Sequence, residues 1–142
     1  MLLGALGFQY LGDLPPCKLC IWQRWPHLVA VLCGAAVLVT AYRPLALLGA
    51  LAALTTAGVG IYHTGVEKGW WEGPSTCTAG EIAGMSADDL LESILATPVI
   101  RCDDILWEMF GLSMASWNAI ISMGLALIWL VAWRQGSSST SQ

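Results

Sequence analysis

The stretch Pro16-Cys17-Lys18-Leu19-Cys20-Ile21-Trp22-Gln23-Arg24 decides how the rest of this sequence is interpreted. Its two cysteines lie three residues apart, and an arginine follows the second cysteine by four residues. A C-x-x-C pair can hold a disulfide that exchanges readily with other thiols. Just beyond it begins an apolar run long enough to enter a membrane. This placement suggests that electrons pass between thiols in water and an acceptor dissolved in lipid.

The composition is typical of a membrane protein. Of the 142 residues, 56% are apolar and 11% are charged, whereas soluble chains carry about 25% charged residues. The length suits one domain on a scale of about 100–200 residues per domain, so we expect a single membrane domain over residues 1–142. The net charge of −4 argues against nucleic-acid binding, because that function needs a basic patch to meet the phosphates.

Charge-free apolar segments separated by turns predict an all-α, polytopic membrane protein built as a four-helix transmembrane bundle. The helices are expected over about 1–14, 20–42, 45–62 and 114–133, with one long extracytoplasmic loop over about 63–113. The apolar start of the chain reaches only about 18 Å, against a hydrocarbon core of about 30 Å. We therefore expect the first membrane helix to lack its beginning in this sequence.

The predicted loop contains two short amphipathic segments. Ser86 resembles the start of a helix that Pro98 ends, and this helix either lies on the membrane surface or packs against the bundle. A second amphipathic turn is expected around residues 105–110, ended by Gly111.

Four of the five cysteines lie in or beside segments that are expected to face water. These are Cys17, Cys20, Cys77 and Cys102, whereas Cys33 lies inside an apolar helix. Four cysteines allow three pairings, among which a sequence does not choose. Two membrane crossings separate the C-x-x-C from the long loop, so all four cysteines face one side. Because disulfides persist outside the cytoplasm, we place that side there.

Cys20 and Arg24 have the properties of a reactive cysteine and its cation. A helix that begins near Cys20 places its sulfur at a positive helix end, which favours the thiolate. Arg24 lies one turn further along the same face, and an arginine so close to lipid is a candidate functional residue. Two alternatives stay open: an inert structural disulfide, with Arg24 reaching the head groups, and half of a zinc site completed by Cys77 and Cys102.

Cys77 and Cys102 enclose 24 residues, and a disulfide that closes such a loop stabilises the fold by roughly 3 kcal/mol. They form either a structural staple or the second pair of an exchange relay with the C-x-x-C. His63 ends the third predicted helix and either hydrogen-bonds a bound quinone, moves protons, or is an ordinary surface residue. For His27 and Cys33 we expect helix packing.

Taken together, these motifs resemble those of the disulfide bond formation protein B (DsbB) family of bacterial inner-membrane thiol oxidases. The resemblance spans about residues 8–133 and rests on residues 16–20 with Arg24, on residues 62–67 with 70–74, on Cys77, and on residues 98–103 leading to 111–118. The departure from the family is at the N-terminus, where we expect this sequence to lack the first turns of the family's complete first helix.

The resemblance implies a four-helix membrane bundle that reoxidises a periplasmic dithiol protein of the DsbA type and passes the electrons to a membrane quinone, ubiquinone or menaquinone. By position, Cys77 receives the attack of the partner's thiolate and Cys102 is its mate. Cys17 then exchanges with the loop pair, while Cys20 faces the quinone. Arg24 assists Cys20 and binds the ring, and His63 matches a histidine near the quinone site. The chain is thus expected in the bacterial inner membrane with its cysteines facing the periplasm.

Two rival functions stay open at this point. One is a quinone reductase resembling vitamin K epoxide reductase, in which the C-x-x-C is expected near the end of the last helix rather than early in the chain. The other is a non-catalytic membrane protein that binds zinc through four cysteines.

Overall fold

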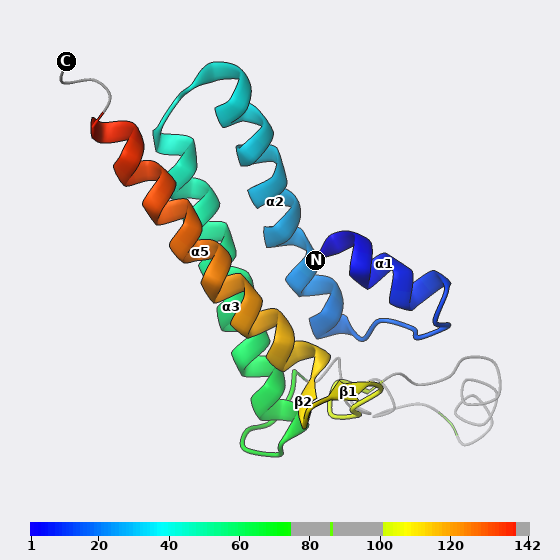
Figure 1. Ribbon diagram of the computed structural model, residues 1–142. Coiled ribbons are helices and arrows are strands. Elements are labelled where there is room, and N and C mark those ends of the chain that lie inside the picture. The colour runs from blue at the N-terminus through cyan, green and yellow to red at the C-terminus, as the bar shows by residue number, and fades with distance from the viewer. Residues whose placement is uncertain (75–85, 87–100, 139–142) are drawn as a thin grey trace.

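Three long helices lie side by side, and a shorter helix extends outward from one of them (Figure 1). The computed structural model describes residues 1–74, 86 and 101–138. Its elements are, in order, α1 (Leu2–Tyr10), α2 (Lys18–Thr40), α3 (Pro44–Glu67), β1 (Glu108–Met109), β2 (Leu112–Ser113) and α5 (Met114–Ser138). Helix α3 packs against both α2 and α5, and α1 lies beside the N-terminal part of α2. The predicted all-α class is confirmed.

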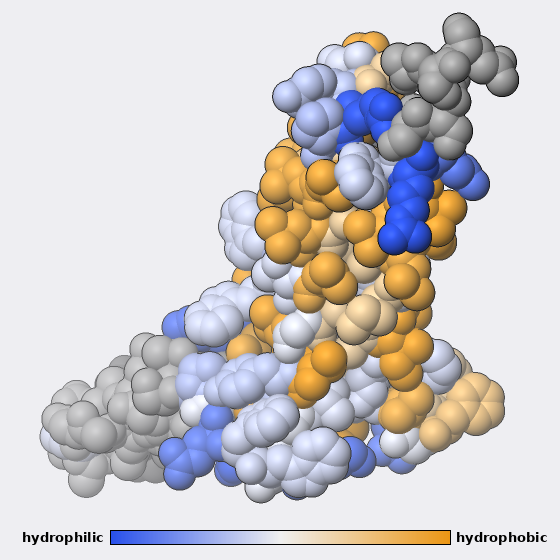
Figure 2. All heavy atoms as spheres, turned by 90° about the vertical axis from the view of Figure 1, so that its left-hand side faces the viewer, coloured by the Kyte–Doolittle hydropathy of each residue, from blue (hydrophilic) through white to orange (hydrophobic). Residues whose placement is uncertain are grey.

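Among the described residues, two helices have the length and apolarity that a membrane crossing requires: α3 over Pro44–Glu67 and α5 over Met114–Gln135. At a rise of about 1.5 Å per residue, each exceeds the hydrocarbon core of about 30 Å. Figure 2 shows apolar side chains over the middle of the helix bundle and polar side chains toward its two ends. This distribution is the one expected of a bundle whose middle faces lipid.

Small residues let α3 and α5 approach closely. Ala53 and Ala57 are buried in α3, as are Ala115 and Ala126 in α5. A Cβ atom added at Gly60 would lie 3.1 Å from both the carbonyl oxygen of Ala115 and the backbone nitrogen of Ala119. Close approach through small residues is the usual way for helices to pack in a membrane, where apolar surface gives little drive to associate.

The observed helix bounds differ from the expected ones at both ends of the chain. Helix α1 is shorter than the predicted 1–14, α2 begins at Lys18 rather than near Cys20, and α5 continues past residue 133 to Ser138.

The largest difference in helix bounds is at the end of α3. The helix continues to Glu67, so residues 63–67 are helical and the prediction that the loop starts at 63 is wrong. His63 and Glu67, whose polar side chains suggested a loop, hydrogen-bond Cys102 and Ser113 inside the protein. Because these side chains are paired without leaving the helix, the helix continues through them.

Residues 105–110 were expected to form a helical turn, and this prediction is also wrong. β1 and β2 form an antiparallel hairpin that pairs Glu108 with Ser113 and Met109 with Leu112. Its two turn residues, Phe110 and Gly111, have φ of 55° and 74°. Positive φ at both positions is the geometry of the tight turn that suits the twist of a hairpin. The predicted amphipathic helix beyond Ser86 and the loop cysteine Cys77 lie outside the described residues.

Candidate functional site

The C-x-x-C pair forms the start of helix α2. Cys17 is the N-cap, and its Sγ accepts the backbone N–H of Cys20 at 3.2 Å. The same sulfur donates a hydrogen bond to Cys20 Sγ at 2.7 Å, and both residues carry free thiols. The bond to Cys20, together with burial, raises the pKa of the Cys17 thiol far above its usual range. Cys17 is therefore the protonated member of the pair, and the sulfur of Cys20 is the acceptor, the role that a thiolate fills.

Cys102 lies in the same cluster of buried side chains as the C-x-x-C. Cys17, Leu19, Val66 and Cys102 form this cluster, with Cys20 and Tyr62 packed against it. Cys102 is 1% exposed and disulfide-bonded. Its expected mate Cys77 lies outside the described residues. The fold thus brings Cys17 and Cys102, which are far apart in sequence, to one end of the bundle.

An ion pair flanks Cys102 on the exposed surface. Arg101 Nε donates to the carboxylate of Asp103 at 3.0 Å, and a second guanidinium nitrogen contacts the other carboxylate oxygen. This bond holds the pKa of Asp103 below its ordinary value.

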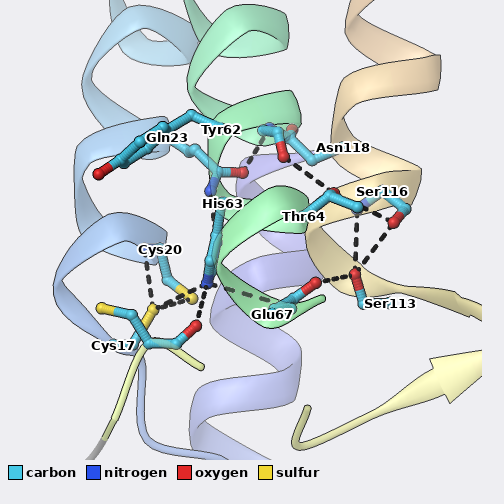
Figure 3. Close-up of polar contacts among 12 residues, drawn as sticks. Cys17, Cys20, Gln23, Tyr62, His63, Thr64, Glu67, Ser113, Ser116 and Asn118 are labelled. Atoms are coloured by element: carbon cyan, nitrogen blue, oxygen red, sulfur yellow. Dashed lines mark hydrogen bonds and ion pairs between the residues drawn. The ribbon is translucent and has the colours of Figure 1, made fainter. Parts of the chain in front are cut away.

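His63 connects the sulfur cluster to the interior of the bundle (Figure 3). Its Nε2 lies 3.1 Å from the backbone oxygen of Cys102 and 3.6 Å from Cys17 Sγ. Its Nδ1 lies 2.9 Å from Gln23 Nε2. His63 is 3% exposed, so it is a buried neighbour of the cysteines rather than a surface residue.

Glu67 follows His63 by one helical turn. Its carboxylate lies 3.8 Å from His63 Nε2 and accepts the hydroxyl of Ser113, the last residue of β2. Ser113 in turn contacts Ser116, which contacts Thr64 of α3 (Figure 3). These bonds tie the end of α3 to the start of α5 beside the cysteines.

Polar side chains continue inward from His63, among them Gln23 and Asn118, to which the sequence analysis assigned no role, and His27, for which it predicted only helix packing. Asn118 of α5 donates to Gln23 Oε1 at 2.6 Å and accepts from His27 at 2.8 Å. Asn118, Gln23 and His27 are each less than 9% exposed. His27 and Gln23 thus do more than pack. The sequence around an isolated polar residue in an apolar helix does not show which other helix the residue contacts. Only the rarity of polar residues in such segments could have identified these side chains as candidates.

A cavity of about 490 Å³ opens beside the cysteine pair. Its walls are mostly apolar and come from α1, from the segment before β1 and from α5, with Phe8 and Trp107 in ring contact at 5.2 Å. The polar groups that reach it include Cys20, Arg24 and His27. A mostly apolar pocket of this size with a few convergent polar groups is typical of a small-molecule site.

Arg24 shares this cavity with Cys20, as expected from their spacing. Its Nη1 donates to Gln9 Oε1 of α1 at 2.7 Å. Helix α1 therefore holds the guanidinium in place as well as supplying apolar wall, a role that the sequence did not reveal.

One group of potential metal ligands comes together within the described part of the chain. The ligand atoms of Cys17, Cys20 and His63 all lie within 4.8 Å of one another. However, His63 Nε2 faces the Cys102 carbonyl oxygen, which calls for a ring N–H at that position. A ring nitrogen that carries a proton has no lone pair for a metal.

The sequence matches the family model described as "Disulfide bond formation protein DsbB" over residues 1–132. Disulfide bond formation protein B of Methylococcus capsulatus is 32% identical, with 94% of this chain and 85% of the relative covered. The protein of the same name from Shewanella sp. strain MR-4 is 31% identical, covering 96% and 83%, and that from Hahella chejuensis is 27% identical, covering 92% and 86%. No solved structure gives a significant match. With these matches and a helical membrane fold, the chain belongs to the DsbB family of disulfide bond formation proteins.

Proposed function

We propose that this protein is a membrane thiol oxidase of the bacterial inner membrane. It reoxidises a DsbA-like dithiol protein on the periplasmic side and passes the electrons to a membrane quinone. The observation that carries the proposal is the burial of Cys102 and Cys17 in one cluster, beside the cavity that Cys17 and Cys20 line. A loop cysteine buried in one cluster with the C-x-x-C, next to an apolar cavity, has the placement that such a relay needs.

The first exchange takes place at the loop cysteines. A thiolate of the partner attacks Cys77 of a Cys77–Cys102 disulfide, so a mixed disulfide forms and Cys102 leaves with the bonding electron pair. The partner's second thiol then resolves the mixed disulfide. The partner leaves oxidised, and Cys77 and Cys102 have gained two electrons and two protons.

The second exchange passes these electrons to the C-x-x-C. The loop dithiol attacks Cys17 of a Cys17–Cys20 disulfide, a Cys77–Cys102 disulfide forms again, and Cys20 leaves as the thiolate. Burial of Cys17 and Cys102 in one cluster shortens the path for this step. Cys20 accepts the hydrogen bond from the Cys17 thiol, which stabilises negative charge on the sulfur of Cys20.

The cavity beside Cys20 suits a quinone ring. Its apolar walls match a flat, lipid-soluble molecule, and a permanent cation at Arg24 with N–H donors matches a ring that carries two carbonyl oxygens. Cys20 and Arg24 would hold the ring, with His63, Phe8 and Trp107 contributing to the wall. When bound, a quinone supplies a two-electron acceptor. Arg24 stabilises the Cys20 thiolate and orients the acceptor, and α1 keeps water from the sulfur.

An anaerobic assay tests the proposal. The purified protein is mixed with a reduced DsbA-like partner and a short-chain quinone, and quinone absorbance is followed. We expect one quinone reduced per partner dithiol oxidised, no turnover with Cys20→Ser, and normal turnover with the matched control Cys33→Ala. Retained quinone reduction by the Cys20→Ser protein would contradict the assigned role of Cys20.

The two rival functions are weaker. The C-x-x-C lies at the start of α2, away from the end of the last helix where a protein resembling vitamin K epoxide reductase is expected to carry it. Zinc binding has the close approach of Cys17, Cys20 and His63 in its favour. Metal analysis with thiol titration separates this function: one zinc per chain and no exchangeable thiols would favour it.

A further inference from the structure

The buried amides between α2 and α5 determine which nitrogen of His63 carries the proton. We infer that Asn118 is a positioning residue that, through Gln23, holds His63 in the tautomer protonated at Nε2, with this N–H directed toward the Cys102 carbonyl oxygen and the Cys17 sulfur. The inference concerns residues of three different helices, and its functional consequence rests on the function proposed above.

The orientation of the Asn118 amide is fixed by its surroundings. Its Nδ2 lies 3.2 Å from Thr56 Oγ1 and 3.4 Å from the backbone oxygen of Thr56. The Thr56 hydroxyl donates its own proton to the backbone oxygen of Gln23 at 3.1 Å, so it can only accept from Asn118. Turned over, the amide would direct its oxygen at these two acceptors.

The other side of the same amide agrees with this orientation. Asn118 Oδ1 accepts from the hydroxyl of Ser122 at 3.3 Å and lies 2.8 Å from His27 Nε2. Every contact of Asn118 therefore places its donor toward Thr56 and Gln23 and its acceptor toward Ser122 and His27. Buried polar groups are almost always paired in this way, and here the pairing leaves one orientation.

Gln23 passes this orientation on to His63. Because Asn118 Nδ2 donates to Gln23 Oε1 at 2.6 Å, the Gln23 amide turns its NH₂ group to His63 Nδ1, 2.9 Å away. His63 Nδ1 must then accept, so a neutral ring carries its proton on Nε2. The far side of the ring gives the same answer independently, since Nε2 lies 3.1 Å from the carbonyl oxygen of Cys102, which can only accept.

This tautomer limits what His63 can do. Its Nε2, 3.6 Å from Cys17 Sγ, already holds a proton and cannot take one from the Cys17 thiol. It donates instead, which stabilises negative charge on Cys17 when that sulfur loses its proton to the reduced quinone as the Cys17–Cys20 disulfide forms again. The amides orient the ring and do not conduct protons, since an amide gives up an N–H proton only with difficulty.

Nitrogen NMR of protein labelled with ¹⁵N-histidine tests the inference, because protonated and unprotonated ring nitrogens differ widely in chemical shift. The chain has only two histidines, and a His27→Gln variant assigns their signals. At pH 8, we expect a single His63 tautomer protonated at Nε2. Any wild-type population of His63 protonated at Nδ1 that exceeds a small fraction would overturn the inference, and this measurement needs no substitution that risks the fold.

Two matched variants sharpen the test. Asn118→Leu lets Gln23 turn its oxygen toward His63 Nδ1, in competition with the Cys102 carbonyl oxygen at Nε2. We therefore expect both His63 tautomers and about a tenfold slower oxidation of Cys17 and Cys20 by quinone. Ser122→Ala removes another buried partner of Asn118 and should leave the single tautomer and the rate unchanged. An unchanged His63 spectrum in a folded Asn118→Leu protein would overturn the role of Asn118. Should the tautomer be found without any oxidase activity, the proposed function fails and this inference stands.

Discussion

Helix α3 meets its neighbours through two interleaved regions of buried side chains, and the two regions make different demands on the sequence. One region, here called the small-residue seam, consists of Ala53, Ala57, Gly60, Ala115 and Ala119, and it packs by shape. The other, here called the polar cluster, consists of Gln23, His27, Thr56, His63 and Asn118 and is held by directed hydrogen bonds. The comparison shows that the seam sets how closely the helices approach, while the cluster sets how the side chains near the sulfur atoms are oriented.

The two buried cysteines near α2 give the largest expected contrast. Cys17 is 4% and Cys33 is 5% exposed, yet only Cys17 touches the cluster of Cys102 and His63. We expect Cys17→Ser to lower thiol oxidation by at least about 10³-fold, since a hydroxyl cannot form the disulfide with Cys20 that the loop dithiol attacks. Cys33→Ser should lower stability by about 1 kcal/mol and leave the rate per folded molecule intact. Steady-state kinetics and thermal unfolding in detergent measure the two effects. Similar oxidation rates for the two variants would contradict the assignment of a redox role to Cys17 and a packing role to Cys33.

The next contrast concerns the cation of the cavity. Arg24→Met removes the permanent charge beside Cys20, and we expect kcat/KM for a short-chain quinone to fall by about 10- to 100-fold. Gln9→Leu removes only the acceptor that holds Arg24 and should have a smaller effect in the same direction. Quinone titrations at fixed partner concentration measure it. A change in kcat/KM for the dithiol partner alone would show that Arg24 does not act on the acceptor.

A pair of glycines tests the small-residue seam. A Cβ at Gly60 would crowd the backbone of α5, whereas a Cβ at Gly58 would meet nothing within 4 Å. Because overpacking separates the helices, we expect Gly60→Val to lower stability by about 1–3 kcal/mol and Gly58→Val to have a much smaller effect. Thermal unfolding in detergent measures both. Equal losses would mean that helix propensity, rather than contact with α5, governs these positions.

The smallest effect expected is a difference between the two thiols of the C-x-x-C in the pH at which each one ionises. A raised pKa leaves less thiolate at any given pH, and Cys17 has its pKa raised by the bond to Cys20 and by burial. Between pH 7 and 10, about the range in which an ordinary thiol ionises, Cys17 should stay protonated and react slowly with iodoacetamide. Mass spectrometry of the alkylated peptide across this range measures it. Rapid modification of Cys17 with a midpoint near the ordinary value would contradict the hydrogen-bonded pair.

The sequence was sufficient for the features that depend on local pattern. Charge-free runs predicted the long helices, and the spacing of Cys20 and Arg24 predicted that they would share a site. The end of α3 was predicted five residues too early, because His63 and Glu67 look like loop residues until their partners Cys102 and Ser113 are known. A helix end is decided by such distant contacts.

The hairpin and the polar cluster depend even more on distant partners. The turn at Phe110 and Gly111 requires positive φ at a phenylalanine. Phenylalanine rarely adopts positive φ, so the sequence does not predict this turn. Asn118 gave no signal because its partners Gln23 and Thr56 lie 95 and 62 residues away. The cavity is likewise assembled from α1, α2 and α5, so no single segment reveals it.

The central claim is that the two sulfur couples exchange at one end of the bundle, and disulfide trapping tests it most directly. In a Cys20→Ser, Cys77→Ser double variant, Cys17 and Cys102 keep their thiols but lose their expected mates. We expect mild oxidation to join Cys17 to Cys102, and peptide mass spectrometry to find this link in most molecules. Recovery of Cys17 and Cys102 as free thiols, or of Cys102 joined to Cys33, would contradict the account.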